Sequence, residues 1–219
     1  MRPMSATETV IDFGNGHDRI NGSDDLKDFK DADLLAYGLT RWRFHYRLKH
    51  PTLYYQRVMR DVEFLQSRGR RYRFHTEARR AYLKFLGIWM GLSIPPGVFG
   101  RGLSVPHYGS VVVNDKVRAG RFCRIHSATN LGEVNGAAPQ LGDGVYVGPG
   151  AVLYGGIKLG SGAVVGANSV VNKDVQSQGV VAGAPARVIS LSGSIDVMPG
   201  GIAEELSRLW RTTPVHERG

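Results

Sequence analysis

Aliphatic side chains recur at every sixth position through the second half of the chain. One series consists of Leu141, Val147, Leu153, Leu159, Val165 and Val171. The residues four places further on are also apolar or small: Val145, Ala151, Ile157, Ala163, Ser169 and Val175. A period of six predicts a short strand followed by a tight turn, and three such units close a triangular coil of eighteen residues. Because stacked coils bury each other's aliphatic residues, the pattern predicts a solenoid.

The same phase continues toward the N-terminus. It passes through Thr129, Cys123, Val117, Val111 and Val105, so we expect the frame to cross residues 130–140 unchanged. A glycine-rich β-sandwich is the alternative. It is disfavoured because the strands of a sandwich do not require apolar residues at every sixth position over about 70 residues.

The first half of the chain has a different pattern. Residues 36–92 show helical periodicity interrupted by Pro51 and the stretch 67–69, which predicts about three short helices. Residues 1–35 are polar and acidic, so we expect a flexible tail with room for one short helix. The domains expected after residue 35 are a basic α-helical domain, a repeat domain and a C-terminal extension with a short helix: 36–92, 93–190 and 191–219.

The composition of the chain indicates in which cellular compartment the protein is expected. The 219 residues are 42% hydrophobic, which is enough for a substantial core. The only cysteine, Cys123, excludes an intramolecular disulfide and fits a reducing environment. The sequence has neither a basic start followed by an apolar run nor an apolar stretch that approaches about 20 residues. We therefore expect a soluble, cytoplasmic protein.

Positive charge is concentrated in the predicted helices. The net charge is +9, and residues 41–89 contain 13 lysines and arginines against three acidic residues. Such a surface can approach an anionic glycan, a lipid-linked phosphate or a membrane, or it can face solvent and pack on the acidic tail. The sequence leaves these possibilities open. Nucleic acid is not expected, because no known binding module is present and the aromatic residues follow the core pattern of helices.

Five segments of the repeat region contain specific motifs: GLSVPHYGSVVVN (102–114), CRIHSATNLG (123–132), LGDGVYVGPGA (141–151), VVNKDV (170–175) and AGAPARVI (182–189). Together they resemble the serine acetyltransferase-like branch of the hexapeptide-repeat acyltransferases. The resemblance implies a mainly β fold, a left-handed parallel β-helix preceded by an N-terminal α-helical domain. It also implies acetyl-CoA as the acyl donor and a homotrimer that binds acetyl-CoA in grooves between neighbouring prisms.

The resemblance places the chemistry on His107, which matches the family's catalytic histidine. An alcohol is a weak nucleophile until a base with a pKa near the operating pH removes its proton, and histidine meets that need. A histidine that only fills a turn is the alternative. His126 follows 19 residues later, about one coil plus one residue, and is expected with Tyr108 to contact the acceptor unless its role is structural. Cys123 falls in the inward frame, which favours direct transfer over an acetyl-enzyme.

The resemblance also assigns residues to acetyl-CoA. Asn172, Lys173 and Arg187 correspond to the end of the groove that holds the CoA phosphates. The pantetheine arm would run past small residues, each of which could instead be a simple corner of the repeat: Gly148, Gly166, Ala167 and Gly183. No metal is required, and the repeat region holds two histidines where a catalytic zinc site needs about three protein ligands.

The remaining candidates are less specific. Glu133 and Asp115 could orient the His107 ring, but only their closeness in sequence suggests it. The histidines outside the repeat region are interpreted as surface or packing residues: His17, His45, His50, His75 and His216.

Departures from serine acetyltransferases guide the expected acceptor. Pro106 and Ser93 stand where those enzymes have aspartates, and residues 135–139 lack an Arg-His pair. Since these groups hold the amino-acid head group of serine, we expect a sugar or surface-polysaccharide hydroxyl as the acceptor. The run IPPGVFG (94–100) and the short helical domain also resemble polysaccharide O-acetyltransferases. Serine O-acetylation in cysteine biosynthesis and a non-catalytic β-helix scaffold are the alternatives.

Overall fold

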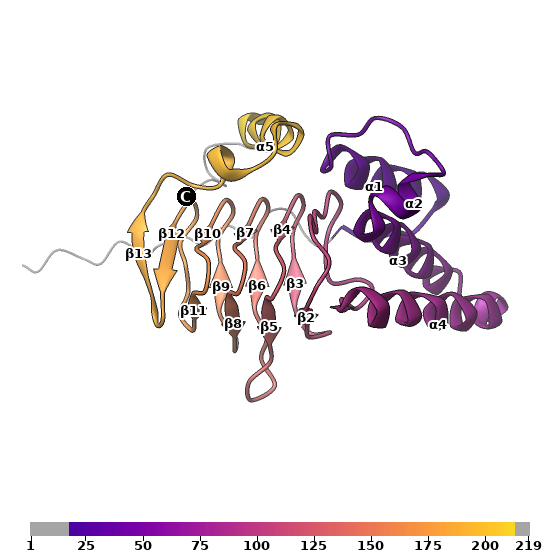
Figure 1. The fold of residues 1–219 in the computed structure, drawn as a ribbon, viewed down its shortest axis with the longest axis horizontal. Coiled ribbons are helices and arrows are strands. Elements are labelled where there is room, and N and C mark those ends of the chain that lie inside the picture. Colours follow the sequence, from indigo (N-terminus) through magenta and orange to yellow (C-terminus); the bar gives the residue numbers. More distant parts are fainter. Residues whose placement is uncertain (1–17, 213–219) are drawn as a thin grey trace, which may run out of the picture.

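The computed structural model describes residues 18–212, in which helices lie at one end of a triangular prism of strands (Figure 1). The helical end consists of α1 (Ser23–Leu35), α2 (Tyr46–Lys49), α3 (Pro51–Ser67), the short 3-10 helix η1 (Arg70–Tyr72) and α4 (Arg73–Met90). The helix α4 ends at Gly91, whose left-handed conformation (φ 69°) turns the chain into the first strand.

Three sheets form the sides of the prism. The first sheet contains β1 (Leu92–Ser93), β2 (Val111–Val113), β5 (Asn130–Gly132), β8 (Val152–Tyr154) and β11 (Val170–Val171). The second contains β4 (Arg124–Ile125), β7 (Tyr146–Val147), β10 (Val164–Val165), β12 (Val180–Gly183) and β13 (Ala186–Ser190). The third contains β3 (Arg118–Ala119), β6 (Gln140–Leu141) and β9 (Lys158–Leu159). All pairs are parallel except β12 with β13, so the predicted left-handed parallel β-helix after N-terminal helices is confirmed.

The repeat changes frame within residues 133–139. Val165 lies opposite Val147, eighteen residues earlier, but Val147 lies opposite Ile125, twenty-two residues earlier. The four additional residues form the loop that protrudes beside β5 in Figure 1, where Val134 pairs with Ala137. The expectation of an unbroken frame is therefore wrong. Each repeat has two inward positions, one in the series of Leu141 and one four residues further on. Cys123 occupies the second of these positions instead of the first. The sequence hides the shift because both positions accept apolar side chains.

The segment expected to be a flexible acidic tail with room for one short helix contains such a helix, α1, at residues 23–35. Residues 1–17, including His17, lie outside the described part of the chain, as does His216. The helix α1 packs on α3 and buries Phe29, Asp33 and Leu34, whereas its other acidic residues face outward. A single inward stripe is enough to hold an otherwise polar helix in place.

A buried ion pair joins these helices to the prism. The Arg60 guanidinium in α3 donates to Asp33 of α1 at 2.9 Å and to the carbonyl oxygens of Phe99 and Gly100 at 2.9 and 2.8 Å. Asp33 in turn accepts hydrogen bonds from the backbone N–H groups of Gly102 and Leu103. The network fixes the helical end against the first coil, five residues before His107.

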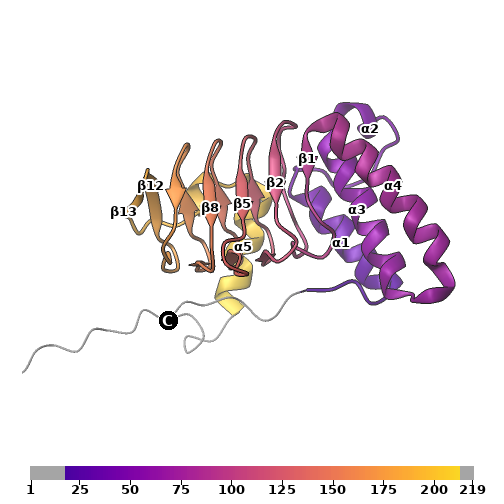
Figure 2. The same ribbon diagram turned by 90° about the horizontal axis from the view of Figure 1, so that it is seen from below.

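The C-terminal segment returns along the outside of the prism (Figures 1 and 2). After the 3-10 helix η2 (Ile195–Val197), α5 (Gly200–Thr212) buries Ile202 and Leu206 completely. Its Leu206 side chain lies over Gly144, and the same apolar cluster includes Phe122 and Ala36. Among the described residues, no helix has the length and apolar character needed to cross a bilayer.

Candidate functional site

His107 and His126 meet at one corner of the prism. His126 directly follows β4 of the second sheet, and His107 precedes β2 of the first sheet. Their ring centroids are 6.0 Å apart. His107 is exposed, whereas His126 is partly buried with its ring 5.1 Å from that of Tyr146. The corner therefore presents one accessible imidazole supported by a second one.

The His126 ring is held as a neutral hydrogen-bond acceptor. The Arg124 Nε–H group donates to His126 Nε2 at 3.3 Å. Partial burial, followed by the charge of Arg124 and the proximity of His107, lowers the pKa of His126 to about 4. At neutral pH the remaining ring proton of His126 is then on Nδ1. His126 is thus not a second base of ordinary strength.

A polar cavity of about 380 Å³ opens beside His107. Its walls come from the start of α3, the first coil and the start of α5, and none of its lining residues is acidic. Besides Tyr108, the polar side chains that line it are those of Tyr37, Lys49, His50, Thr52, Ser104, His107 and Arg124. Tyr108 also lines the cavity and is 67% exposed, whereas His126 lies behind Arg124 and does not line it.

A partly buried tyrosine fixes the wall of this cavity. The Tyr37 hydroxyl oxygen lies 2.6 Å from both Gln56 Oε1 and the Val105 carbonyl oxygen, and it accepts a hydrogen bond from the Val105 N–H. Burial raises the pKa of Tyr37, so its hydroxyl stays protonated as a donor. Since Val105 is two residues before His107, the contact holds the segment that carries the proposed base.

A column of small residues leads away from His126 along the same corner. The backbone N–H groups of His126, Gly148 and Gly166 donate to carbonyls of the next coil, which stacks these residues over one another. A Cβ atom on Gly148 would lie 2.8 Å from the Val165 carbonyl oxygen, so glycine is required for the coils to approach. Ala167 lies beside this column and is exposed.

The other residues expected to bind acetyl-CoA lie elsewhere on the prism. Asn172 and Lys173 are exposed at the corner that follows the first sheet, where the Asn172 amide donates to the Tyr154 hydroxyl at 3.3 Å. Gly183 and Arg187 are exposed on the hairpin of β12 and β13. Within one chain the candidate residues therefore form two groups. Gly148, Gly166 and Ala167 lie at the corner that precedes the strands of the first sheet, whereas Asn172 and Lys173 lie at the corner that follows them.

Several other candidates have no contact with the site. Within residues 18–212, neither Glu133 nor Asp115 has a hydrogen bond or ion pair with His107, and Glu133 pairs with Lys116 at 3.7 Å. Cys123 is fully buried, and burial raises the pKa of its thiol to about 12, so it is unsuited to act as a nucleophile. Across the described residues, no group of three His, Cys, Asp or Glu side chains is placed to hold a metal ion.

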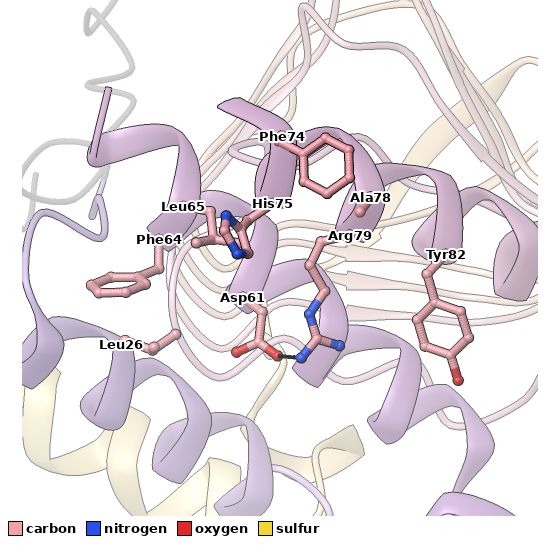
Figure 3. Close-up of a pocket in the computed structure, with 9 residues that line it drawn as sticks. All are labelled: Leu26, Asp61, Phe64, Leu65, Phe74, His75, Ala78, Arg79 and Tyr82. Atoms are coloured by element: carbon pink, nitrogen blue, oxygen red, sulfur yellow. Dashed lines mark ion pairs between the residues drawn. The ribbon is translucent and has the colours of Figure 1, made fainter. Parts of the chain in front are cut away.

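A second cavity of about 490 Å³ lies among the helices, away from the histidine corner (Figure 3). Its lining is mainly apolar and includes Phe64 and Phe74. Asp61 and Arg79 form an ion pair across it at 3.8 Å, so their charges largely compensate each other. Because this cavity contains none of the residues of the His107 corner, we place the chemistry at the smaller, polar cavity.

Sequence reasoning missed Arg124 and did not place His50 at the site. The structure places His50 in the wall of the polar cavity, although the sequence suggested only surface or packing roles. Arg124 precedes His126 by two residues, and side chains two apart on a strand lie on the same face. That spacing was a usable signal for Arg124, whereas the position of His50 depends on how α3 packs on the prism.

Comparisons with known proteins agree with the fold and the motifs. Residues 138–173 match the family described as bacterial transferase hexapeptide (six repeats). The serine acetyltransferase of Mycobacterium tuberculosis is 37% identical over 127 residues, which are 56% of this chain and 54% of that protein. The soybean serine acetyltransferase complexed with serine is 29% identical with a TM-score of 0.63, covering 75% of this chain and 69% of the other.

A serine acetyltransferase solved in complex with CoA is 22% identical with a TM-score of 0.59, over 76% of this chain and 71% of that one, and supports the fold alone. The chain spans about half the length of the curated relatives that it matches. The predicted resemblance to the serine acetyltransferase-like hexapeptide-repeat proteins is confirmed.

The expectation of a sugar or polysaccharide acceptor is contradicted by these relatives, which are serine acetyltransferases. The expectation rested on charged family residues that are absent at Pro106, Ser93 and 135–139. The structure explains why their absence misleads. Arg124 and Lys49 bring positive charge into the cavity from other elements, so the missing Arg-His pair does not leave the cavity without cations.

Proposed function

We propose that this hexapeptide-repeat protein transfers the acetyl group of acetyl-CoA to the hydroxyl of serine. The observation that carries the proposal is the position of His107, exposed at a polar cavity and beside a column of small residues. The similarity to serine acetyltransferases in sequence and fold supports serine as the acceptor and acetyl-CoA as the donor.

The proposed reaction is a direct transfer. His107 accepts the proton of the acceptor hydroxyl while the hydroxyl oxygen attacks the thioester carbonyl carbon. The resulting tetrahedral oxyanion collapses, the carbon–sulfur bond breaks, and the CoA thiolate takes up the proton from His107. His126 remains neutral, and Tyr108 at the rim is positioned to contact the acceptor. The buried Cys123 has no part in the transfer.

The two groups of candidate acetyl-CoA residues favour a shared groove. We place the pantetheine arm along the column of Gly148, Gly166 and Ala167, with Gly183 at its far end. Asn172 and Lys173 lie across the first sheet and would meet this column only from a neighbouring prism. A homotrimer with three grooves satisfies this requirement, and Arg187 adds a cation for the CoA phosphates. A monomer in analytical ultracentrifugation at the assay concentration would contradict it.

The helical domain also has a surface suited to an anionic membrane. Along α4, exposed apolar side chains recur at helical spacing, among them Phe85 (64% exposed), Ile88 (75%) and Trp89 (73%). The exposed cations Arg73 and Lys84 lie on the same helix. An apolar stripe flanked by lysine and arginine is typical of helices that lie in a lipid interface. We propose that the protein acts in the cytoplasm and contacts the membrane peripherally through this face.

Vesicle cosedimentation tests the membrane contact. The parent protein should sediment with phosphatidylglycerol vesicles but less with phosphatidylcholine vesicles, and the double variant F85S/W89S should remain in solution. The variant V188S is a matched control, because Val188 is 56% exposed on β13 at the opposite end of the molecule. Equal sedimentation of F85S/W89S and the parent would contradict the proposal.

Release of free CoA thiol tests the transfer itself. Purified protein with acetyl-CoA and L-serine should release CoA and form one equivalent of O-acetylserine, identified by mass spectrometry. N-acetylglucosamine serves as the sugar comparison and should release CoA only at the background rate. Absence of CoA release with L-serine at concentrations that saturate related enzymes would rule out the proposed function.

A further inference from the structure

Arg124 is a partly buried cation without a carboxylate partner in the described chain. Its Nη1 donates to Ser104 Oγ at 2.8 Å and its Nε donates to His126 Nε2 at 3.3 Å, and both acceptors are neutral. Within residues 18–212, no aspartate or glutamate oxygen lies within 4.0 Å of the guanidinium, whereas the buried Arg60 has both Asp33 and Glu63. Desolvated charges are normally paired, so this cation is an exception that needs an explanation.

The surroundings of Arg124 favour an anion. The cavity that it lines also contains Lys49 and the imidazoles of His50 and His107, and none of its lining residues is acidic. The helix α5 begins at the same wall with Gly200 and Gly201, and the N-terminal end of a helix carries partial positive charge. Burial lowers the pKa of Arg124, but an arginine remains protonated at neutral pH.

Two hydrogen bonds hold the guanidinium in a fixed orientation. Ser104 anchors Nη1 from the preceding coil and His126 anchors Nε from the same coil, while Nη2 has no hydrogen-bond partner in the part of the chain that the structure describes. A fixed guanidinium with a free nitrogen can receive a carboxylate without a further loss of side-chain freedom. Partial burial, followed by the charge of Arg124, lowers the pKa of His126, so its ring stays neutral and can accept from Arg124.

We propose that Arg124 binds the carboxylate of the acceptor and that the acceptor's ammonium group is not required. The inference rests on the proposed transfer from acetyl-CoA to a serine-like hydroxyl and specifies what the site recognises. Arg124 contacts the His126 ring, which is 6.0 Å from the His107 ring, so a small hydroxy acid can reach both groups. No acidic side chain lines the cavity to pair with an ammonium group. The acceptor class is therefore a small 3-hydroxy carboxylate.

Three acceptors separate the two charges of serine. L-Serine carries both charges, L-serinamide lacks the carboxylate, and L-glycerate, which has the same configuration as L-serine, lacks the ammonium group. The parent protein should use L-serine and L-glycerate with KM values within about tenfold of each other and L-serinamide at least about tenfold less well. Comparable kcat/KM values for L-serinamide and L-serine would overturn the assignment of Arg124 to the carboxylate. A strict requirement for the ammonium group would overturn the claim that this group is not needed.

The variant R124M tests the residue directly. It should raise KM for L-serine and L-glycerate about 10- to 100-fold, as expected for a lost hydrogen bond to a charged group, with a much smaller change in kcat. The rate with L-serinamide should not change, and R124K should recover part of the loss. A purely structural Arg124 would instead lower the rates with all three acceptors equally. The variant R118M is the matched control, because Arg118 lies on β3 and is absent from the cavity.

Direct binding separates this inference from the proposed function. Calorimetric titration of L-glycerate into the parent protein and into R124M measures the subsite without turnover. If no acceptor releases CoA but glycerate binds the parent at least about tenfold more tightly than R124M, the transfer is wrong and the carboxylate subsite stands. If serine is acetylated but R124M binds and reacts as the parent does, the transfer stands and the role of Arg124 is refuted.

Discussion

The rings of His107 and His126 lie 6.0 Å apart, and they differ in what they contact. His107 lines the cavity, whereas the His126 ring accepts a hydrogen bond from Arg124. The difference assigns separate tasks to two residues that look alike in the sequence. In the proposed transfer the exposed imidazole takes the proton of the acceptor, whereas the other imidazole fixes a guanidinium.

Replacement of His107 by alanine should abolish transfer without affecting folding. Loss of a general base typically lowers the rate by about 10²- to 10⁴-fold. Since His107 is exposed and has no hydrogen bond within the described residues, the midpoint of thermal unfolding should stay within about 2 °C of the parent. CoA release and calorimetry measure the two quantities. A variant that keeps more than about a hundredth of the parent rate would contradict the assignment.

The neutral state of His126 should make folding stability depend on pH. Its pKa is about 4 in the folded protein, whereas an unfolded histidine titrates near pH 6.5. Between these values the unfolded state binds the additional proton, so this residue's contribution lowers stability as the pH falls from about 6.5 toward 4. H126Q keeps an acceptor for Arg124 but does not titrate. The fall in unfolding temperature between pH 7 and pH 5 should be smaller in H126Q, and an equal fall would refute the explanation.

Removal of Arg60 should strongly destabilise the helical end. R60M leaves Asp33 buried without its cation, which typically costs about 3–5 kcal/mol. The double variant D33N/R60M should be more stable than the sum of the two single changes predicts, because it leaves no unpaired charge at position 33. Urea unfolding of all four proteins measures this coupling. Strictly additive effects would show that the pair does not join α1 and α3 energetically.

The protruding loop should be removable only in a length that restores the repeat. Deletion of residues 134–137 places Leu141 six positions after Leu131, as in the neighbouring coils. The unfolding midpoint should then stay within about 4 °C of the parent. Deletion of residues 134–136 instead shifts the strands by one position and turns their inward side chains outward, so that variant should not fold. If both deletions fold equally well, the frame shift described here is incorrect.

The regular part of the prism could be predicted because its determinants are local. All six residues of the series from Leu141 to Val171 are buried, as a period of six requires. The inserted loop escaped prediction because Cys123 is acceptable in either inward position. The place of α1 escaped because the partner of Asp33 is Arg60, twenty-seven residues away.

Only the part of the site that depends on a local sequence motif could be predicted. His107 is recognisable from its motif, but Arg124 gains meaning from groups that the fold brings to it. Ser104 comes from the preceding coil, and the wall beside it comes from α5. The sequence around Arg124 does not show whether a carboxylate pairs with it, since ion pairs form between residues that the fold brings together.

The return of α5 also bears on how this prism resists fraying. In a solenoid each coil contacts only its neighbours, so terminal coils can ordinarily detach one after another. Here Trp210 lies over Gly162 while Gly201 lies against the Leu35 carbonyl at the end of α1. The last coils cannot unfold without releasing α5, which is also anchored at the helical end of the molecule. Unfolding of single coils one after another is therefore replaced by one cooperative step.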